Sequence, residues 1–194
     1  MAWSIVSSGP YIEALHEIFL PTRDADGVLL FTFPLGQGAI PFIHLSDFAR
    51  YVAWILSHPE ESNGMNLEIA TAHVPGAEVA AAFTAVTGRP AKYIDVPIDV
   101  WHEKAWAKLP KGPKTKIGYR DVDDRLLLQT YQENFTAWWE LYKASGGNSG
   151  LIKRDYALLD RILPDRIKTV EEWMRKVEYD GQRRSVLKSQ DEYS

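Results

Sequence analysis

Extended and helical stretches alternate along the chain, and this alternation limits the possible folds more than any other feature of the sequence. The β-type runs lie at 2–7, 28–33, 40–44, 65–70 and 91–96. Between them, apolar residues recur at helical spacing, as in 47–57 and 75–86. Strands interleaved with helices are typical of a sheet that is covered by helices. The sequence therefore predicts an α/β fold.

The first of these runs, at 2–7, begins almost at Met1 and ends in Gly9-Pro10. The backbone N–H and C=O groups of a strand need hydrogen-bonding partners. This strand must therefore pair with a later strand of the chain or with another chain.

Several helices are expected from the signals at their ends. Ser46 can cap the helix at 47–57, and Gly88 stands where the cap of the helix at 75–86 belongs. Thr169 and Glu172 form a capping box for the last helix. The other helices are expected at 11–19, 98–108, 122–144 and 156–163, with a linker at 145–150. The apolar face of the helix at 47–57 consists of Phe48, Val52, Ile55 and Leu56.

Composition and charge exclude several classes of protein. The chain has no cysteine, and none of its five histidines has HExxH spacing, so we expect no metal site. The net charge is −4 and there is no basic stripe, which argues against nucleic-acid binding. There is no signal peptide and no apolar run near the roughly 18 residues that span a bilayer, so we expect a cytoplasmic protein without membrane contact.

Two motifs of nucleotide-dependent enzymes are absent from the sequence. No Gly-rich G-x-G-x-x-G loop follows a strand, so the chain lacks the loop that cradles a dinucleotide's phosphates. No tyrosine is followed four residues later by lysine, which removes the usual proton-transfer pair of short-chain dehydrogenases. The sequence alone therefore points to no complete nucleotide-binding or catalytic motif.

Several segments together resemble a known family. They are 3–13, with its Ser-Gly-Pro-Tyr-Ile-Glu ending; 33–44, followed by Ser-Asp-Phe-Ala at 46–49; the Thr-Gly-Arg-Pro-Ala of 87–91; and the C-terminal stretches 154–164 and 171–181. The residues of these segments and their order along the chain resemble the NmrA-like family of atypical short-chain dehydrogenases, in particular its fungal members. In that family the first segment is the sixth strand of the Rossmann sheet and the turn after it.

The resemblance implies an architecture and a site. The chain would be the C-terminal part of an NAD(P)-binding Rossmann-type sheet plus a mostly helical substrate-binding lobe, with the N-terminal strands missing. Residues 1–181 would form this region, and 182–194 a disordered tail. Gly9, Pro10 and Tyr11 would lie near the nicotinamide of NADP or NAD, with Tyr11 as the candidate catalytic residue. The alternative is an ordinary strand-to-helix turn in which proline fixes φ.

The resemblance leaves three functions open. A whole relative would be an NAD(P)H-dependent reductase or dehydrogenase that acts on a small-molecule substrate, in fungal secondary metabolism. The alternatives are an NAD(P)-sensing regulator of the co-repressor type and a non-catalytic truncated remnant. In-frame codons for G-x-x-G-x-x-G upstream of Met1 would distinguish the first two from the third. We expect this chain alone to bind NADP(H) weakly or not at all.

The resemblance also makes 2–7 and 65–70 parallel neighbours, which leaves the other edge of 2–7 open. That strand carries Trp3, Ile5 and Val6 and has no proline or lysine to discourage pairing. We expect self-association or a partner chain through this edge. The competing possibility is that the strand pairs with 28–33 within the chain.

Three further features have a structural and a functional interpretation. Asp47 opens a helix, where a carboxylate complements the helix dipole. His44 lies in a short apolar run and is expected to be a hydrogen-bonded histidine of the core or its rim. The tryptophan pairs at 101/106 and 138/139 are expected in the core. The functional alternative is a substrate lid built from 98–118.

Overall fold

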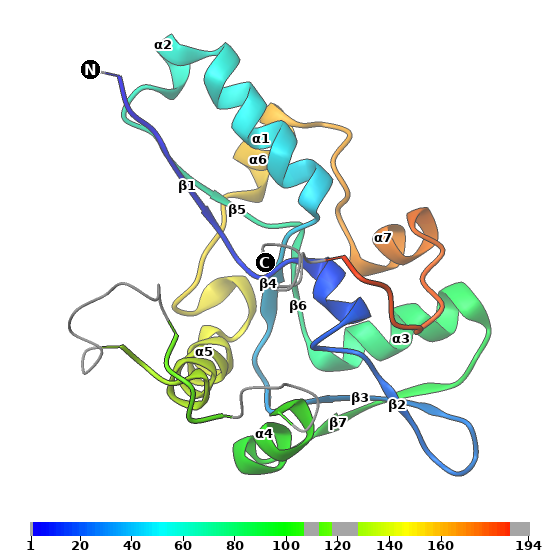
Figure 1. Ribbon diagram of the computed structural model, residues 1–194. Helices are drawn as coiled ribbons and strands as arrows, with labels where there is room; N and C mark the ends of the chain where they lie inside the picture. Colours follow the sequence, from blue (N-terminus) through cyan, green and yellow to red (C-terminus); the bar gives the residue numbers. More distant parts are fainter. Residues whose placement is uncertain (1, 107–112, 118–127, 187–194) are drawn as a thin grey trace.

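The computed structural model describes residues 2–106, 113–117 and 128–186, and it confirms the predicted α/β fold (Figure 1). Its described strands form three small sheets. The first pairs β1 (Ile5–Ser8) with β5 (Asn66–Ile69), and the second has the order β2 (Thr22–Arg23), β3 (Leu29–Phe33), β7 (Ala91–Asp95). The third pairs β4 (Ile40–Phe42) with β6 (Ala72–Val74) in antiparallel fashion.

β1 and β5 are parallel neighbours, as the resemblance implied, with Ile5 opposite Asn66 and Ser8 opposite Ile69. The strand starts later than the predicted run at 2–7. The alternative pairing of β1 with 28–33 is wrong, because β3 is bonded to β2 on one edge and to β7 on the other. Within the described residues, β5 is the one strand that pairs with β1, so the other edge of β1 is open there.

The segment after β1 is a short 3-10 helix, η1 (Ile12–His16), where the sequence predicted an α-helix at 11–19. Tyr11 is extended, with φ −72° and ψ 133°, and it forms a bridge to Ile43, so the helix cannot begin earlier. Glu17 leaves the helical region with φ −133°. The apolar spacing still predicted the burial correctly, since Ile12, Leu15 and Phe19 are all in the core.

The helix predicted at 47–57 is α1 (Leu45–Ser57), followed by the single turn of α2 (Pro59–Ser62). Ser46 does not cap it, because the helix begins earlier and His44 occupies the N-cap position. The predicted face was partly wrong, since Leu56 is 76% exposed. The buried face carries Asp47, Tyr51 and Ile55, and its two polar members were missed because only apolar residues define an apolar pattern.

The remaining helices follow their end signals. Gly88 ends α3 (Gly76–Thr87) in the left-handed conformation, with φ 69°, as predicted. α5 (Tyr131–Ser145) begins later than the predicted 122, because Thr130 and Glu133 form a capping box, a sequence signal that was passed over in favour of the longer apolar spacing. Residues 122–127 lie outside the described ranges, as do 107–112 and 118 of the suggested lid. The other described helices are α4 (Ile98–Trp106), α6 (Tyr156–Ile162) and α7 (Val170–Lys176).

Two features near the C-terminus modify the predictions. The stretch predicted as a linker at 145–150 contains a 3-10 turn, η2 (Gly147–Ser149), that contacts β6. Thr169 caps α7 by accepting from the Glu172 N–H, but the Glu172 carboxylate accepts from Lys168 instead of closing the predicted box. Residues 182–186 are described and have no regular secondary structure, whereas 187–194 lie outside the described part, so the boundary at 181 stays a prediction.

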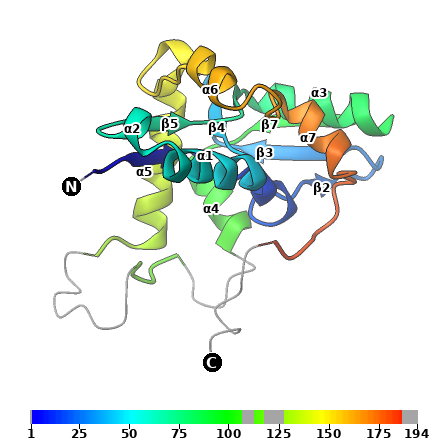
Figure 2. The same ribbon diagram turned by 90° about the horizontal axis from the view of Figure 1, so that it is seen from above.

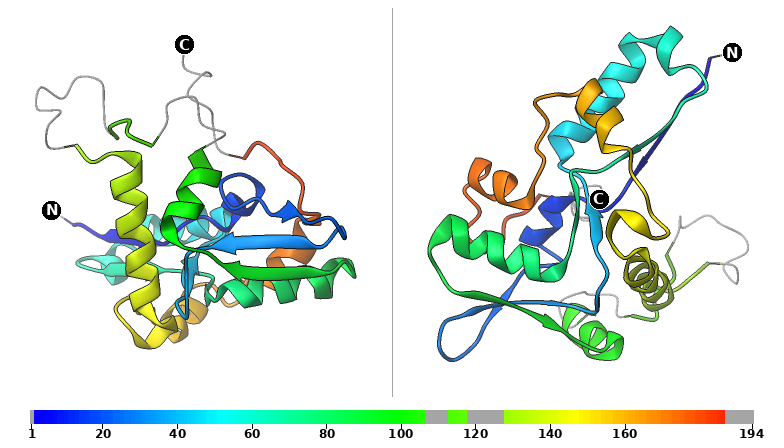
Figure 3. Two further views of the ribbon diagram at one scale, coloured as in Figure 1. Left: turned by 90° about the horizontal axis from the view of Figure 1, so that it is seen from below. Right: turned by 180° about the vertical axis from the view of Figure 1, so that it is seen from behind.

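The core has two clusters. The larger one is rich in aromatic rings and lies where α3 packs on β3 and β7 and α7 packs on α3, with residues of η1, α4 and α5 in the same cluster (Figure 2). The smaller one lies between β1, β5, α1 and α6. Figure 3 shows α4 and α5 standing across the end of the strands β3 and β7. Among the described helices, none is both long enough and apolar enough to cross a membrane.

Candidate functional site

The turn Gly9–Tyr11 leaves the carboxyl end of β1 and is tied to the end of β4. The Ile43 N–H donates to the Pro10 carbonyl (2.9 Å), and the Ile12 N–H donates to the Ile43 carbonyl (3.0 Å). A Cβ atom on Gly9 would lie 1.9 Å from the carbonyl oxygen of Pro41. The missing side chain of Gly9 is therefore explained by the close approach of β4, without any ligand.

Tyr11, the candidate catalytic residue, is half-buried beside α1. Its ring meets that of Phe48 edge-on, with 6.2 Å between the centroids and 77° between the planes. Both residues pack against the smaller core cluster. The roles assigned to Gly9, Pro10 and Tyr11 by resemblance stay predictions.

A buried pair that the sequence did not bring together lies next to this turn. Glu13 of η1 and His44 are 8% and 7% exposed, and Oε1 of Glu13 lies 2.5 Å from Nδ1 of His44. The same oxygen accepts from the Leu45 N–H at 3.1 Å, and the His44 N–H donates to Oγ1 of Thr71. His44 is thus the hydrogen-bonded core histidine that was expected. Its pairing with Glu13, which holds η1 to the start of α1, has no signal in the local sequence.

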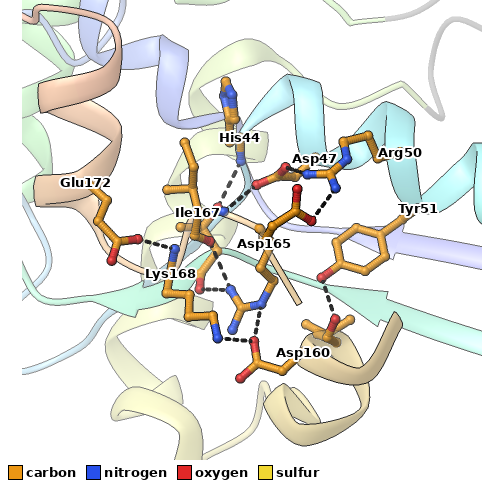
Figure 4. A network of polar contacts seen from close by, with 12 residues as sticks. His44, Asp47, Arg50, Tyr51, Asp160, Asp165, Ile167, Lys168 and Glu172 are labelled. Carbon is orange, nitrogen blue, oxygen red and sulfur yellow. Dashed lines mark hydrogen bonds and ion pairs between the residues drawn. The ribbon is translucent and has the colours of Figure 1, made fainter. Parts of the chain in front are cut away.

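A second buried network holds the C-terminal segment against α1 (Figure 4). Asp47 is 2% exposed, and its Oδ2 accepts from the Ile167 N–H at 2.9 Å. Its Oδ1 accepts from Arg50 (3.2 Å), which also forms an ion pair with Asp165. Asp47 does stand in the first turn of α1, as the dipole interpretation required, but it also bonds a segment far away in the sequence.

Arg166 extends this network to the end of β5. Its guanidinium donates to the Thr71 carbonyl at 2.7 Å and to Oδ1 of Asp160 at 2.8 Å. Burial alone would raise the pKa of Asp160, but the attraction and hydrogen bonds of Arg166, with Lys168, hold that pKa below its ordinary value. Both carboxylate oxygens of the buried Asp47 accept hydrogen bonds, and the buried Arg166 donates to two different segments, which indicates a structural clamp.

A cavity of about 440 Å³ lies farther along the chain segment that leaves β1. Phe19 lines it directly after η1, and Thr32 lines it near the carboxyl end of β3. α4, which begins just after β7 ends, contributes another wall. The parallel strands β3 and β7 thus both run toward this cavity. Its main lining residues are Phe19, Thr32, Trp101, Lys104, Phe135 and Arg183.

The cavity and the turn Gly9–Tyr11 are separate features, since no residue of the turn lines the cavity. The sequence singled out Trp101 only as a core residue or as part of a lid, and it is buried at 4% exposure. Lys104 and Ala105 also fall within the suggested lid. The remaining lining residues were missed as site residues, because they come from four other segments and no local motif joins them.

The turn after β1 does not offer the backbone N–H groups that the phosphates of a dinucleotide need. Such a site needs free backbone N–H groups where a parallel strand turns into a helix. After β1, the Ile12 N–H is used by the Ile43 carbonyl and the Ala14 N–H by the Tyr11 carbonyl. In the described ranges, no cluster of three or more histidine and carboxylate side chains could hold a metal ion either.

A model of the NmrA-like family matches residues 1–119, more than half of the 194-residue chain. The chain belongs to the NmrA-like family. This NmrA-like chain is 30% identical over 99 residues to an NAD(P)H azoreductase of Xenophilus azovorans, and the match covers 51% of this chain and 34% of the azoreductase. The family named by resemblance is therefore confirmed.

Solved structures share the fold. NmrA, a negative transcriptional regulator, in complex with NADP is 16% identical with a TM-score of 0.60, and the match covers 91% of this chain and 52% of that one. A nucleoside-diphosphate-sugar epimerase of Staphylococcus aureus is 18% identical with a TM-score of 0.63, and the match covers 90% of this chain and 52% of the epimerase. NmrA has also been solved with NAD. The NmrA-like chain thus spans about half the length of these structures and about a third of the azoreductase.

Proposed function

We propose that this chain is the substrate-side part of an NAD(P)H-dependent oxidoreductase and that the cavity beside α4 receives the substrate. In open α/β sheets, ligands bind outside the carboxyl ends of the strands. The observation that carries the proposal is the position of the cavity. Thr32 lines it at the carboxyl end of β3, and α4 closes it just after β7.

The chain's own residues would supply binding and positioning in this function. Phe19, Trp101 and Phe135 would exclude water from a bound molecule, since a desolvated apolar wall stabilises an apolar ligand. The Glu13–His44 pair would fix η1, and with it the segment that carries Phe19. NADP or NAD would supply the hydride, as expected from the NADP and NAD complexes of NmrA. In a whole relative, the part that this chain does not span would hold the phosphates of the dinucleotide.

The resemblance to fungal members adds a role in secondary metabolism to the proposal, without naming a substrate. A second candidate is an NAD(P)-sensing regulator. Two observations favour it: NmrA, which shares the fold, is a negative transcriptional regulator, and the sequence has no Tyr-x-x-x-Lys pair. A sensor needs to bind the dinucleotide and a partner, but it does not need to transfer a hydride.

The test begins with the 5′ end of the transcript. In-frame codons for G-x-x-G-x-x-G are expected upstream of Met1, and a transcript without them would favour the non-catalytic remnant. The encoded product is then assayed for NADPH oxidation with an aromatic aldehyde, a quinone and an azo compound. Saturable oxidation with at least one acceptor is expected. Tight NADPH binding without oxidation of any of them would favour the regulator.

A matched pair of variants ties the activity to the cavity. Trp101→Ala removes a wall and should raise the KM for the acceptor. Trp3→Ala removes an indole that is 56% exposed and outside the cavity, and it should leave the KM unchanged. Equal effects of the two substitutions would contradict the placement of the substrate.

A further inference from the structure

We propose that the cavity beside α4 selects small molecules with a flat aromatic body and an anionic group, such as an aryl carboxylate. This inference names the ligand class for the cavity. It rests on the proposed function only for calling that ligand a substrate, because binding to this chain can be measured without any turnover.

The walls of the cavity favour an aromatic body. The ring centroids of Trp101 and Phe135 are 5.8 Å apart, with 37° between the ring planes. Phe19 stacks on Trp138, with 5.7 Å between the ring centroids and 16° between the planes. Phe19 and Trp101 are 2% and 4% exposed, so packing on other sides fixes their orientation. The small exposed parts of Phe19 and Trp101, together with the half-buried Phe135, favour another ring in edge-on contact.

The rim of the cavity carries two cations. Lys104 stands three residues after Trp101 on α4, and side chains at this spacing share one face of a helix. Arg183 comes from the C-terminal segment. Within the part of the chain that the structure describes, no carboxylate forms an ion pair with either side chain.

Contacts on both sides hold the segment that carries Arg183. The Gln182 carbonyl lies 3.3 Å from Nδ1 of His16, and the Val186 N–H donates to Oε1 of Glu17 at 2.9 Å. These contacts fix the backbone on either side of Arg183, whose side chain lines the cavity. They also give residues 182–186 a place in the site, although the sequence pattern assigned them to a tail.

The charge balance of the lining favours an anion. Lys104 and Arg183 oppose a single lining carboxylate, Glu17, whose oxygen is already engaged by the Val186 N–H. Low-dielectric walls beside two cations strengthen their attraction for a negative group. The volume of about 440 Å³ falls in the range of small-molecule sites, roughly 300–1,000 Å³.

The experiment uses two probes of the same shape that differ in charge, 2-naphthoate and 2-naphthamide, titrated calorimetrically into the chain without any nucleotide. Naphthoate should bind about tenfold tighter than naphthamide at low salt, as for one charge-assisted hydrogen bond. The difference should shrink as salt screens the cations. Equal affinities, or no binding of either probe, would overturn the proposal.

Substitutions locate the binding. Lys104→Gln and Arg183→Gln should each weaken naphthoate binding by about five- to tenfold and leave naphthamide binding nearly unchanged. The matched controls Lys92→Gln on β7 and Arg161→Gln on α6 change exposed cations that do not line the cavity. A loss in the cavity variants no larger than in these controls would overturn the proposal.

One more variant tests the cavity itself. Ala105→Phe places a ring within it and should abolish the binding of both probes, whereas undiminished binding would mean that they bind elsewhere. Thermal unfolding of each variant checks that it is folded. Because no step uses NADPH, failure here overturns the ligand class, while failure of NADPH oxidation overturns the oxidoreductase function.

Discussion

Replacing Asp47 by alanine should destabilise the chain by about 2–5 kcal/mol. The substitution leaves the buried N–H of Ile167 without its acceptor, which costs roughly 1.5–3 kcal/mol for a bond to a charged group. The lost contact with the partly exposed Arg50 adds at most about 1 kcal/mol. Loss of the carboxylate from the first turn of α1 adds about 0.3–1 kcal/mol.

Urea unfolding followed by tryptophan fluorescence measures this loss, and amide hydrogen exchange at Ile167 locates it. Asp47→Asn keeps an oxygen acceptor and should cost about 1–2 kcal/mol. Asp99→Ala is the matched control, because Asp99 also stands in a first helical turn but is exposed, and it should cost less than about 1 kcal/mol. If Asp47→Ala costs no more than Asp99→Ala, the carboxylate does not clamp the C-terminal segment and the reasoning fails.

Three further predictions concern the core, a histidine and the open edge. Phe83→Ala should lower the free energy of unfolding by about 3–5 kcal/mol, because the ring is fully buried. Phe48→Ala should lower it clearly less, because that ring is half-buried. Equal urea midpoints of the two variants would contradict the burial assigned to these rings. Burial lowers the pKa of His73 below its ordinary value of 6.5, so the unfolded chain binds the proton first. The stability that neutral His73 contributes is therefore complete above about pH 6.5 and is lost as the pH falls below this value. Between pH 7 and 5, the His73→Gln variant should lose less stability than the wild type. If the free energy of unfolding falls equally steeply with pH in both proteins, this prediction is refuted. We also propose that the chain self-associates or binds a partner through the open edge of β1, beside which Trp3 is 56% exposed; sedimentation at micromolar concentration should show association that Trp3→Lys weakens, and a stable monomer would rule this out.

The sequence predicted those elements of the fold that are determined by residues close together in the chain. Gly88 ends α3 because it alone tolerates the left-handed conformation there without strain, and the apolar spacing of 75–86 gave its buried face. The family's strand order supplied the one long-range pairing that was predicted, between β1 and β5. Local rules failed where two signals competed, as at Thr130, where a capping box sets the start of α5.

The candidate site was much less predictable. Glu13 and His44 are far apart in the chain, and the pairing of the turn after β1 with the end of β4 brings them together. The rim cation Arg183 lies in a polar stretch with no apolar period, so its contacts could not be read from spacing. Sites assembled from several segments carry no signal in any one of them, since their geometry depends on the packing of the whole chain.

The most direct test of this account is a calorimetric titration of the chain with NADPH and NADP⁺. In the turn after β1, the N–H groups of Ile12 and Ala14 are already bonded within the chain, and the sequence has no Gly-rich G-x-G-x-x-G loop after a strand. The account therefore predicts no saturable binding at low micromolar concentrations of either nucleotide. A dissociation constant in the low micromolar range or tighter would contradict it, because the chain would then hold the dinucleotide without the part that we assign to this task.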